Sequence, residues 1–114
     1  MHELSIALSI VDGALEELQR HQGARAEAIH LRLGHLSGVD REALMFSYDV
    51  ARRETALERS RLIIEEVPIY ILCPACEAER PIAHFPELTC AQCGAAGPVV
   101  HGEELEITGM EIVT

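Results

Sequence analysis

Four cysteines constrain this chain more than any other feature of its sequence. They form two Cys-x-x-Cys pairs, Cys73 with Cys76 and Cys90 with Cys93, and thirteen residues separate the pairs. Two such pairs turn four thiolates toward one tetrahedral ion, which is typical of a structural zinc ribbon. A four-thiolate site leaves no open position for water or substrate, so we do not expect catalysis there. Redox use of the pairs is the weaker alternative, because two matched pairs favour joint ligation.

The composition indicates one small globular protein that does not bind nucleic acid. Of its 114 residues, 48% are apolar, which is enough for one modest core with a small insert. Nineteen acidic residues outweigh nine basic ones, and the net charge of −10 disfavours contact with phosphate backbones or anionic lipid. The amino terminus shows no secretory signal. We therefore expect a cytoplasmic, soluble protein with no membrane insertion.

Hydrophobic periodicity predicts two helices before the cysteine pairs. In the first helix, apolar residues recur at spacings of three and four, and Gly23 is placed to end it. The predicted buried face of this helix consists of Leu4, Leu8, Val11, Leu15 and Leu18. Asp40 precedes a helix-forming run that has Glu42 in its first turn, a pattern typical of an N-cap. The second helix is predicted to run from there to about Arg53.

Alternation of apolar and polar residues predicts three strands. They cover residues 28–33, 61–72 and 103–114, and Pro68 marks a bend or an edge in the second. The last strand follows the cysteine module and has no core of its own to join. We therefore expect it to return to the first sheet.

These elements predict an α+β fold. A three-stranded sheet is covered by two helices, and a zinc-ribbon module is inserted between the second and third strands. The predicted domains are an α/β domain of residues 1–72 plus 99–114 and a zinc-ribbon domain of residues 73–98.

The amino terminus offers a second set of metal donors. The Met1 amine, the His2 amide and imidazole, and the Glu3 amide lie in consecutive chelate positions. A planar set of nitrogens suits Ni(II) or Cu(II), whereas zinc prefers a tetrahedron. The amine and the imidazole must release protons to bind, so binding depends on pH. By spacing alone, a Met-His start is more often a disordered terminus than a metal site, and both interpretations stay open.

The remaining histidines show no chelating pattern. They lack i,i+4 pairing and any His-Glu-x-x-His motif, and we expect most of them at the surface or on strands: His21, His30, His35, His84 and His101. No Ser/His/Asp or Cys/His arrangement has motif support, so we do not predict an enzyme.

Several stretches along the chain together resemble the HypA/HybF nickel metallochaperones. They are the start Met-His-Glu-Leu-Ser, the Leu33-Gly34-x-Leu36 turn, Asp40-x-x-Ala43-Leu44-x-Phe46, Leu62-Ile63-Ile64-Glu65-x-Val67-Pro68, both cysteine pairs, and Gly102-x-Glu104-Leu105-x-Ile107-x-x-Met110-Glu111. Each motif is weak alone. Their order and spacing over essentially the whole chain are specific.

This resemblance implies nickel delivery during maturation of NiFe hydrogenase, and no catalysis. The implied partners are a HypB-type GTPase and the hydrogenase large subunit, with urease as a further recipient in some organisms; a homodimer is compatible with it. It implies a labile nickel site at Met1, His2 and Glu3, with Asp40 close by as a carboxylate that orients or neutralises the site. It also implies structural zinc at Cys73, Cys76, Cys90 and Cys93.

Three departures from the family pattern refine this prediction. Glu77 stands where a glycine often follows the first cysteine pair, while Ala78 and Gly94 stand where some relatives carry a histidine. Exchange of thiolate for imidazole ligands is therefore not expected. The alternative function, from a different class, is a zinc-ribbon adaptor that binds another protein through its α/β face, with the Met-His start incidental.

Overall fold

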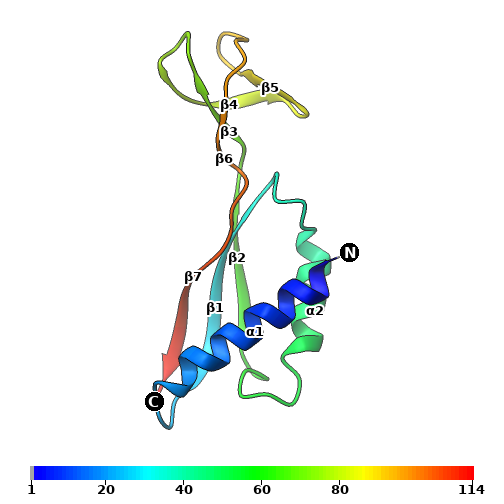
Figure 1. Ribbon diagram of the computed structural model, residues 1–114, viewed down its shortest axis with the longest axis vertical. Helices are drawn as coiled ribbons and strands as arrows, with labels where there is room; N and C mark the ends of the chain where they lie inside the picture. Colours follow the sequence, from blue (N-terminus) through cyan, green and yellow to red (C-terminus); the bar gives the residue numbers. More distant parts are fainter. Residues whose placement is uncertain (1) are drawn as a thin grey trace. The chain divides into compact units, whose positions relative to one another are not determined.

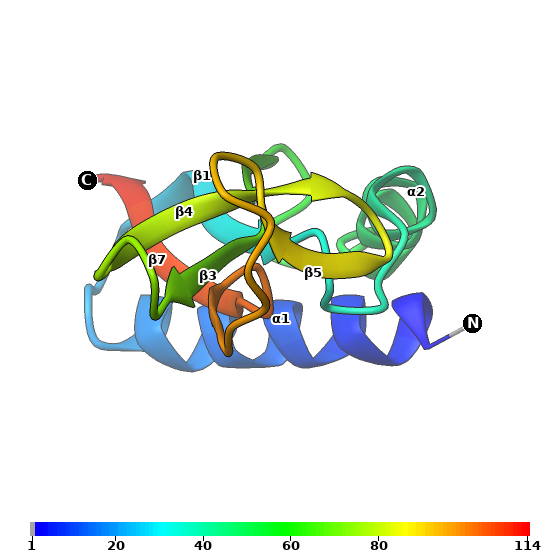
Figure 2. The same ribbon diagram turned by 90° about the horizontal axis from the view of Figure 1, so that it is seen from above.

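The structure is a computed structural model that describes residues 2–114, and it divides into two compact units (Figure 1; Figure 2 gives the view from above). The first unit contains Met1–Arg32, Val39–Glu65 and Glu106–Thr114, and the second unit contains Leu33–Gly38 and Glu66–Leu105. That residues 73–98 form a domain of their own stays a prediction. No helix in the described part of the chain is long and apolar enough to cross a bilayer.

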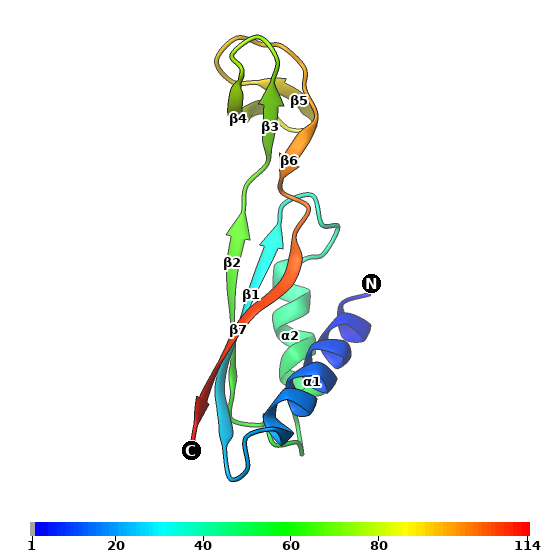
Figure 3. The same cartoon turned by 60° about the vertical axis from the view of Figure 1, so that its left-hand side comes forward.

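The first unit is built on a three-stranded sheet with two helices packed against it. The elements are α1 (Glu3–Gln19), β1 (Arg25–Gly34), α2 (Arg41–Ala51), β2 (Arg61–Val67) and β7 (Leu105–Val113). The strand order is β2-β1-β7. Figure 3 shows β1 and β2 running in the same direction and β7 in the opposite one, with both helices on one side of the sheet. The last strand therefore returns to the first sheet, and the predicted fold class is confirmed.

Small side chains decide which face of α1 is buried. Its buried residues are Glu3, Ala7, Ile10, Val11, Ala14 and Leu18. Leu4 and Leu8 are 48% and 46% exposed, so the prediction that they belong to the buried face is wrong. The alanines allow the helix backbone to approach its neighbours closely, and this turns the buried face away from the two leucines.

Asp40 caps α2 as predicted, since its Oδ2 accepts a hydrogen bond from the Ala43 amide at 3.1 Å.

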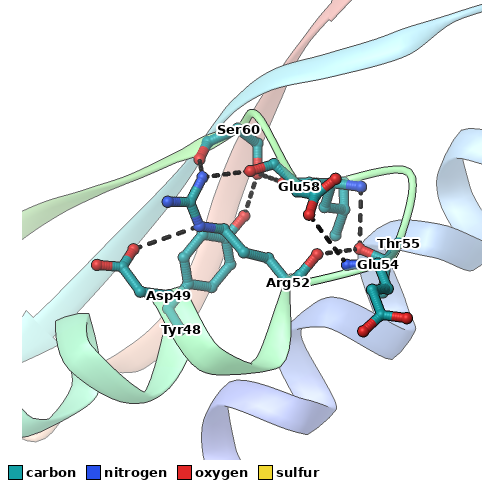
Figure 4. A network of polar contacts seen from close by, with 8 residues as sticks. Tyr48, Asp49, Arg52, Glu54, Thr55, Glu58 and Ser60 are labelled. Carbon is teal, nitrogen blue, oxygen red and sulfur yellow. Dashed lines mark hydrogen bonds and ion pairs between the residues drawn. The ribbon is translucent and has the colours of Figure 1, made fainter.

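A polar loop joins the other end of α2 to β2. The helix ends at Ala51, and Arg52 then donates hydrogen bonds to the backbone carbonyls of Glu58 and Ser60 (Figure 4). These contacts satisfy backbone groups of a connection that has no regular structure.

The second unit is built on a four-stranded sheet. Its strands are β3 (Tyr70–Cys73), β4 (Ala78–His84), β5 (Glu87–Cys90) and β6 (Val99–His101), in the order β5-β4-β3-β6. The prediction of one strand over residues 61–72 is wrong: β2 ends at Val67, and β3 begins at Tyr70 in a different sheet. Pro68 has no amide hydrogen to donate to a ladder, which explains the break.

Candidate metal centres

The four cysteine sulfurs lie close together in the second unit. All four Sγ atoms are within 4.8 Å of one another. The Sγ atoms of Cys73 and Cys93 are 3.4 Å apart, and those of Cys76 and Cys90 are 4.0 Å apart. A tetrahedral zinc ion with Zn–S distances of about 2.3 Å requires sulfur separations of about 3.8 Å. The donor set and its spacing therefore fit a zinc ion.

Each cysteine pair forms the same tight turn. The amide of Glu77 donates to the Cys73 carbonyl at 2.8 Å, and the amide of Gly94 donates to the Cys90 carbonyl at 2.9 Å. Both donors have left-handed backbone, with φ of 55° at Glu77 and 81° at Gly94. The two turns thus present their thiols in equivalent ways, one from the end of β3 and the other from the end of β5.

Neighbouring groups set the protonation of the thiols. Burial raises the pKa of Cys90, but backbone amides in the following turn and the Cys73 thiol outweigh it and lower the pKa to about 6. The Ala95 amide lowers the pKa of Cys93, but the other thiols and burial outweigh it and raise the pKa to about 12. Four thiolates this close repel one another, so a cation is needed before all four lose their protons.

Sequence analysis missed one residue at this cluster. Arg80 on β4 is partly buried, and interaction with the Cys76 thiol raises the pKa of its guanidinium. The signal was present, because Arg80 is the only lysine or arginine between the two cysteine pairs. It was counted only as part of the net charge.

At the other candidate site, Glu3 fixes the first turn of α1. Its side chain is only 7% exposed, and its Oε2 accepts a hydrogen bond from the Asp40 amide at 3.1 Å. The charged amino terminus and this hydrogen bond lower the pKa of the Glu3 carboxyl to about 2. The contact brings the start of α1 to the start of α2, so Asp40 lies beside Glu3.

His2 stands at the N-cap position of α1 with an exposed side chain. Its carbonyl accepts a hydrogen bond from the Ile6 amide at 2.9 Å, while its imidazole makes no capping hydrogen bond. Met1 lies outside the described residues, so nickel coordination by its amine stays a prediction.

Four of the remaining histidines, His21, His30, His35 and His101, pair with carboxylates in the described chain. His30 Nε2 lies 2.6 Å from Glu111 Oε2, and His101 Nε2 lies 3.0 Å from Glu79 Oε1. Among residues 2–114, the four cysteines are the only group of three or more potential ligands close enough to share one ion. The paired histidines are therefore explained as surface ion pairs or hydrogen bonds.

Comparisons with known proteins point to one family over nearly the whole chain. The family model described as hydrogenase/urease nickel incorporation, metallochaperone, hypA matches residues 1–112. The hydrogenase maturation factor HypA of Roseiflexus sp. (strain RS-1) is 46% identical over 97% of this chain and 91% of that protein. Its counterpart in Chloroflexus aurantiacus (strain ATCC 29366 / DSM 635 / J-10-fl) is 43% identical over 97% of this chain and 98% of that protein.

Solved structures show the same fold. A solution structure of HypA protein matches with a TM-score of 0.73 and 19% identity, covering 99% of this chain and 97% of that one. The solution structure of the Ni metallochaperone HypA from Helicobacter pylori matches with a TM-score of 0.67 and 20% identity, covering 99% and 98%. With the family model and the relatives above, these likenesses show that the chain belongs to the HypA family of metallochaperones for nickel incorporation into hydrogenase and urease.

Proposed function

We propose that this protein binds one Ni(II) ion at its amino terminus and delivers it during maturation of a NiFe hydrogenase, while zinc at the four cysteines serves a structural role. Family membership supports this, because the family model describes nickel incorporation and the curated relatives are hydrogenase maturation factors. Nickel is the cargo, so the proposal requires a site that binds it reversibly.

The contact between Glu3 and Asp40 carries the nickel proposal. Because the Asp40 amide holds the Glu3 carboxylate, the first turn of α1 is anchored, and His2 extends from an ordered helix instead of a loose end. The proposed donors are the Met1 amine, the His2 amide and imidazole, and the Glu3 amide. A planar set of four nitrogens suits Ni(II). Asp40 orients this turn through its backbone amide.

The proposal for zinc rests on the cysteine geometry. Four thiolates in a tetrahedral spacing suit zinc, and they leave no open coordination position, so Cys73, Cys76, Cys90 and Cys93 would hold the ion without taking part in nickel transfer. When bound, zinc would cross-link the two turns that follow β3 and β5.

Nickel titration of the zinc-loaded protein, untagged and beginning with Met1, tests the nickel site. We expect a near-ultraviolet and visible absorption spectrum typical of planar Ni(II). His2→Ala, or acetylation of the Met1 amine, should abolish this spectrum without releasing zinc, because the first change removes the imidazole donor and the second removes the amine donor. His21→Ala, which removes an exposed histidine after α1, serves as the control. Unchanged nickel affinity in both terminal variants would refute the site.

The proposed partners are a HypB-type GTPase and the hydrogenase large subunit in the cytoplasm, as a maturation role implies. Co-purification with the GTPase, sedimentation to detect a homodimer, and hydrogenase activity in a strain lacking this protein would test them. We expect the His2→Ala variant to bind the GTPase normally and to fail in hydrogenase activation. Full activation by this variant would instead support a zinc-ribbon adaptor without a nickel role.

A further inference from the structure

Arg80 is the only lysine or arginine in the second unit. It lies in the middle of β4, where burial alternates so that Ala78, Arg80 and Ile82 are partly buried while the residues between them are exposed. In the neighbouring strand, fully buried Ile71 is opposite Arg80. Ile71 and Ile82 belong to the small core formed with the cysteines. Arg80 therefore lies on the face of the sheet that carries the thiols.

The guanidinium of Arg80 has no carboxylate partner in the structure. Among residues 2–114, no acidic side chain forms an ion pair with it, although its neighbour Glu79 pairs with His101 at 3.0 Å. Its Nε atom is buried and has no hydrogen-bond partner within the described chain. A cation that is partly removed from water is stabilised by negative charge close by.

The cysteine cluster is the source of negative charge that reaches Arg80. Cys73 is paired with Ala78, two residues from Arg80 on the same face of the sheet, and its sulfur lies within 4.8 Å of the other three. The Cys76 thiol, and more weakly the thiols of Cys90 and Cys73, raise the pKa of the Arg80 guanidinium. The second unit contains six glutamates, and yet Arg80 lies on the face of the sheet that carries the thiols.

We propose that Arg80 is the counter-ion of the four-thiolate metal site: its guanidinium offsets part of the negative charge of the metal-bound cluster. This inference rests on the zinc site of the proposed function. Four thiolates around a divalent ion keep a double negative charge, which a nearby cation stabilises. Arg80 is thus a positioning residue that helps to retain the metal, and it does not ligate it.

Metal binding by variants at position 80 tests this role. The probes are Zn(II), measured by competition with a chelator, and Co(II), whose thiolate charge-transfer band reports the electron density on sulfur. Arg80→Met should weaken metal affinity by about 10- to 100-fold and move the Co(II) band to longer wavelength, because sulfur electrons are held less tightly without the cation. Arg80→Lys keeps the charge and should retain most of both properties. Arg61→Met, which removes an exposed arginine of the first unit, is the control.

The outcomes separate this inference from the zinc proposal beneath it. Wild-type affinity and an unshifted band in Arg80→Met would overturn the counter-ion role. Equal losses in the Met and Lys variants with an unshifted band would show that Arg80 acts by packing alone, and would overturn it as well. If Arg80→Met does not fold, Arg80→Gln takes its place in the same comparison. Wild-type protein that fails to bind either ion through four sulfurs would instead remove the zinc site itself.

Discussion

The two cysteine turns differ in the conformational strain at one backbone position. Glu77 and Gly94 occupy the same left-handed position after their pairs, but only glycine adopts it without a steric penalty. We expect Glu77→Gly to stabilise the zinc-loaded protein by about 0.5–1 kcal/mol, and Gly94→Ala to destabilise it by about 1 kcal/mol. No atom lies within 4 Å of a Cβ built at Gly94, so the effect comes from the backbone alone. Thermal unfolding measures both changes, and a destabilised Glu77→Gly variant would contradict the argument.

Because the phenol of Tyr48 is buried, we expect the folded protein to lose stability at alkaline pH. Its hydroxyl contacts Ser60 Oγ, and burial raises the pKa of Tyr48 above its ordinary value of 10.0, although the Ser60 contact and Arg52 act in the opposite direction. The folded state therefore holds this proton more tightly than the unfolded state. The stabilisation is fully present below pH 10 and is lost as the pH rises through the raised pKa.

Substitution of Tyr48 tests whether this residue causes the loss of stability at alkaline pH. Tyr48→Phe should lower the free energy of unfolding by about 1 kcal/mol at pH 7, because it removes a buried hydrogen bond. It should also reduce the loss of stability above about pH 10. Urea unfolding at both pH values measures these effects. Tyr70→Phe, which changes a partly buried tyrosine of the second unit, is the control, and an equal alkaline loss in wild type and Tyr48→Phe would contradict the prediction.

At the scale of elements, Glu3 couples the start of α1 to the start of α2. Its folded pKa of about 2 lies below its ordinary value of 4.5, so the ionised carboxylate is favoured in the folded state. The stability that it contributes is present above pH 4.5 and is lost as the pH falls from 4.5 toward 2. Glu3→Gln should be less stable than wild type at pH 7 and should show a smaller loss of stability over that acid range.

The control for this experiment lies on the same helix. Glu16 is exposed on α1, and Glu16→Gln should leave the acid unfolding profile nearly unchanged. Circular dichroism during acid titration follows both variants. If Glu3→Gln loses stability between pH 4.5 and 2 as wild type does, protonation of the Glu3 carboxylate is not the cause.

At the scale of the whole molecule, the two units have cores of very different size. The core of the first unit draws buried residues from both helices and the sheet. The apolar cluster around the cysteines in the second unit has three buried members among the described residues, namely Ile71, Cys73 and Cys90. Metal removal by a chelator should therefore unfold the second unit and leave the first unit folded. Amide hydrogen exchange should show lost protection in β3–β6 and retained protection in α1 and β1, whereas simultaneous unfolding of both units would contradict this.

Features that depend on residues close together in the chain were predictable from the sequence alone. The cysteine turns need only their Cys-x-x-Cys spacing, and the α2 cap needs only Asp40 and the amides that follow it. The third strand was placed correctly because an isolated strand after the module must join an existing sheet. Membership of the HypA family was also evident from motifs spread over the whole chain.

Only the tertiary structure decided which surfaces meet. Periodicity cannot tell which side of α1 faces the sheet when both sides carry apolar residues, so close packing of Ala7 and Ala14 left Leu4 and Leu8 exposed. It also cannot show that the chain leaves one sheet for another at Pro68. The contacts of Glu3 with Asp40 and of Arg80 with the thiols join residues that are distant in sequence or on different strands. Such contacts depend on burial and charge in three dimensions, which folding alone creates.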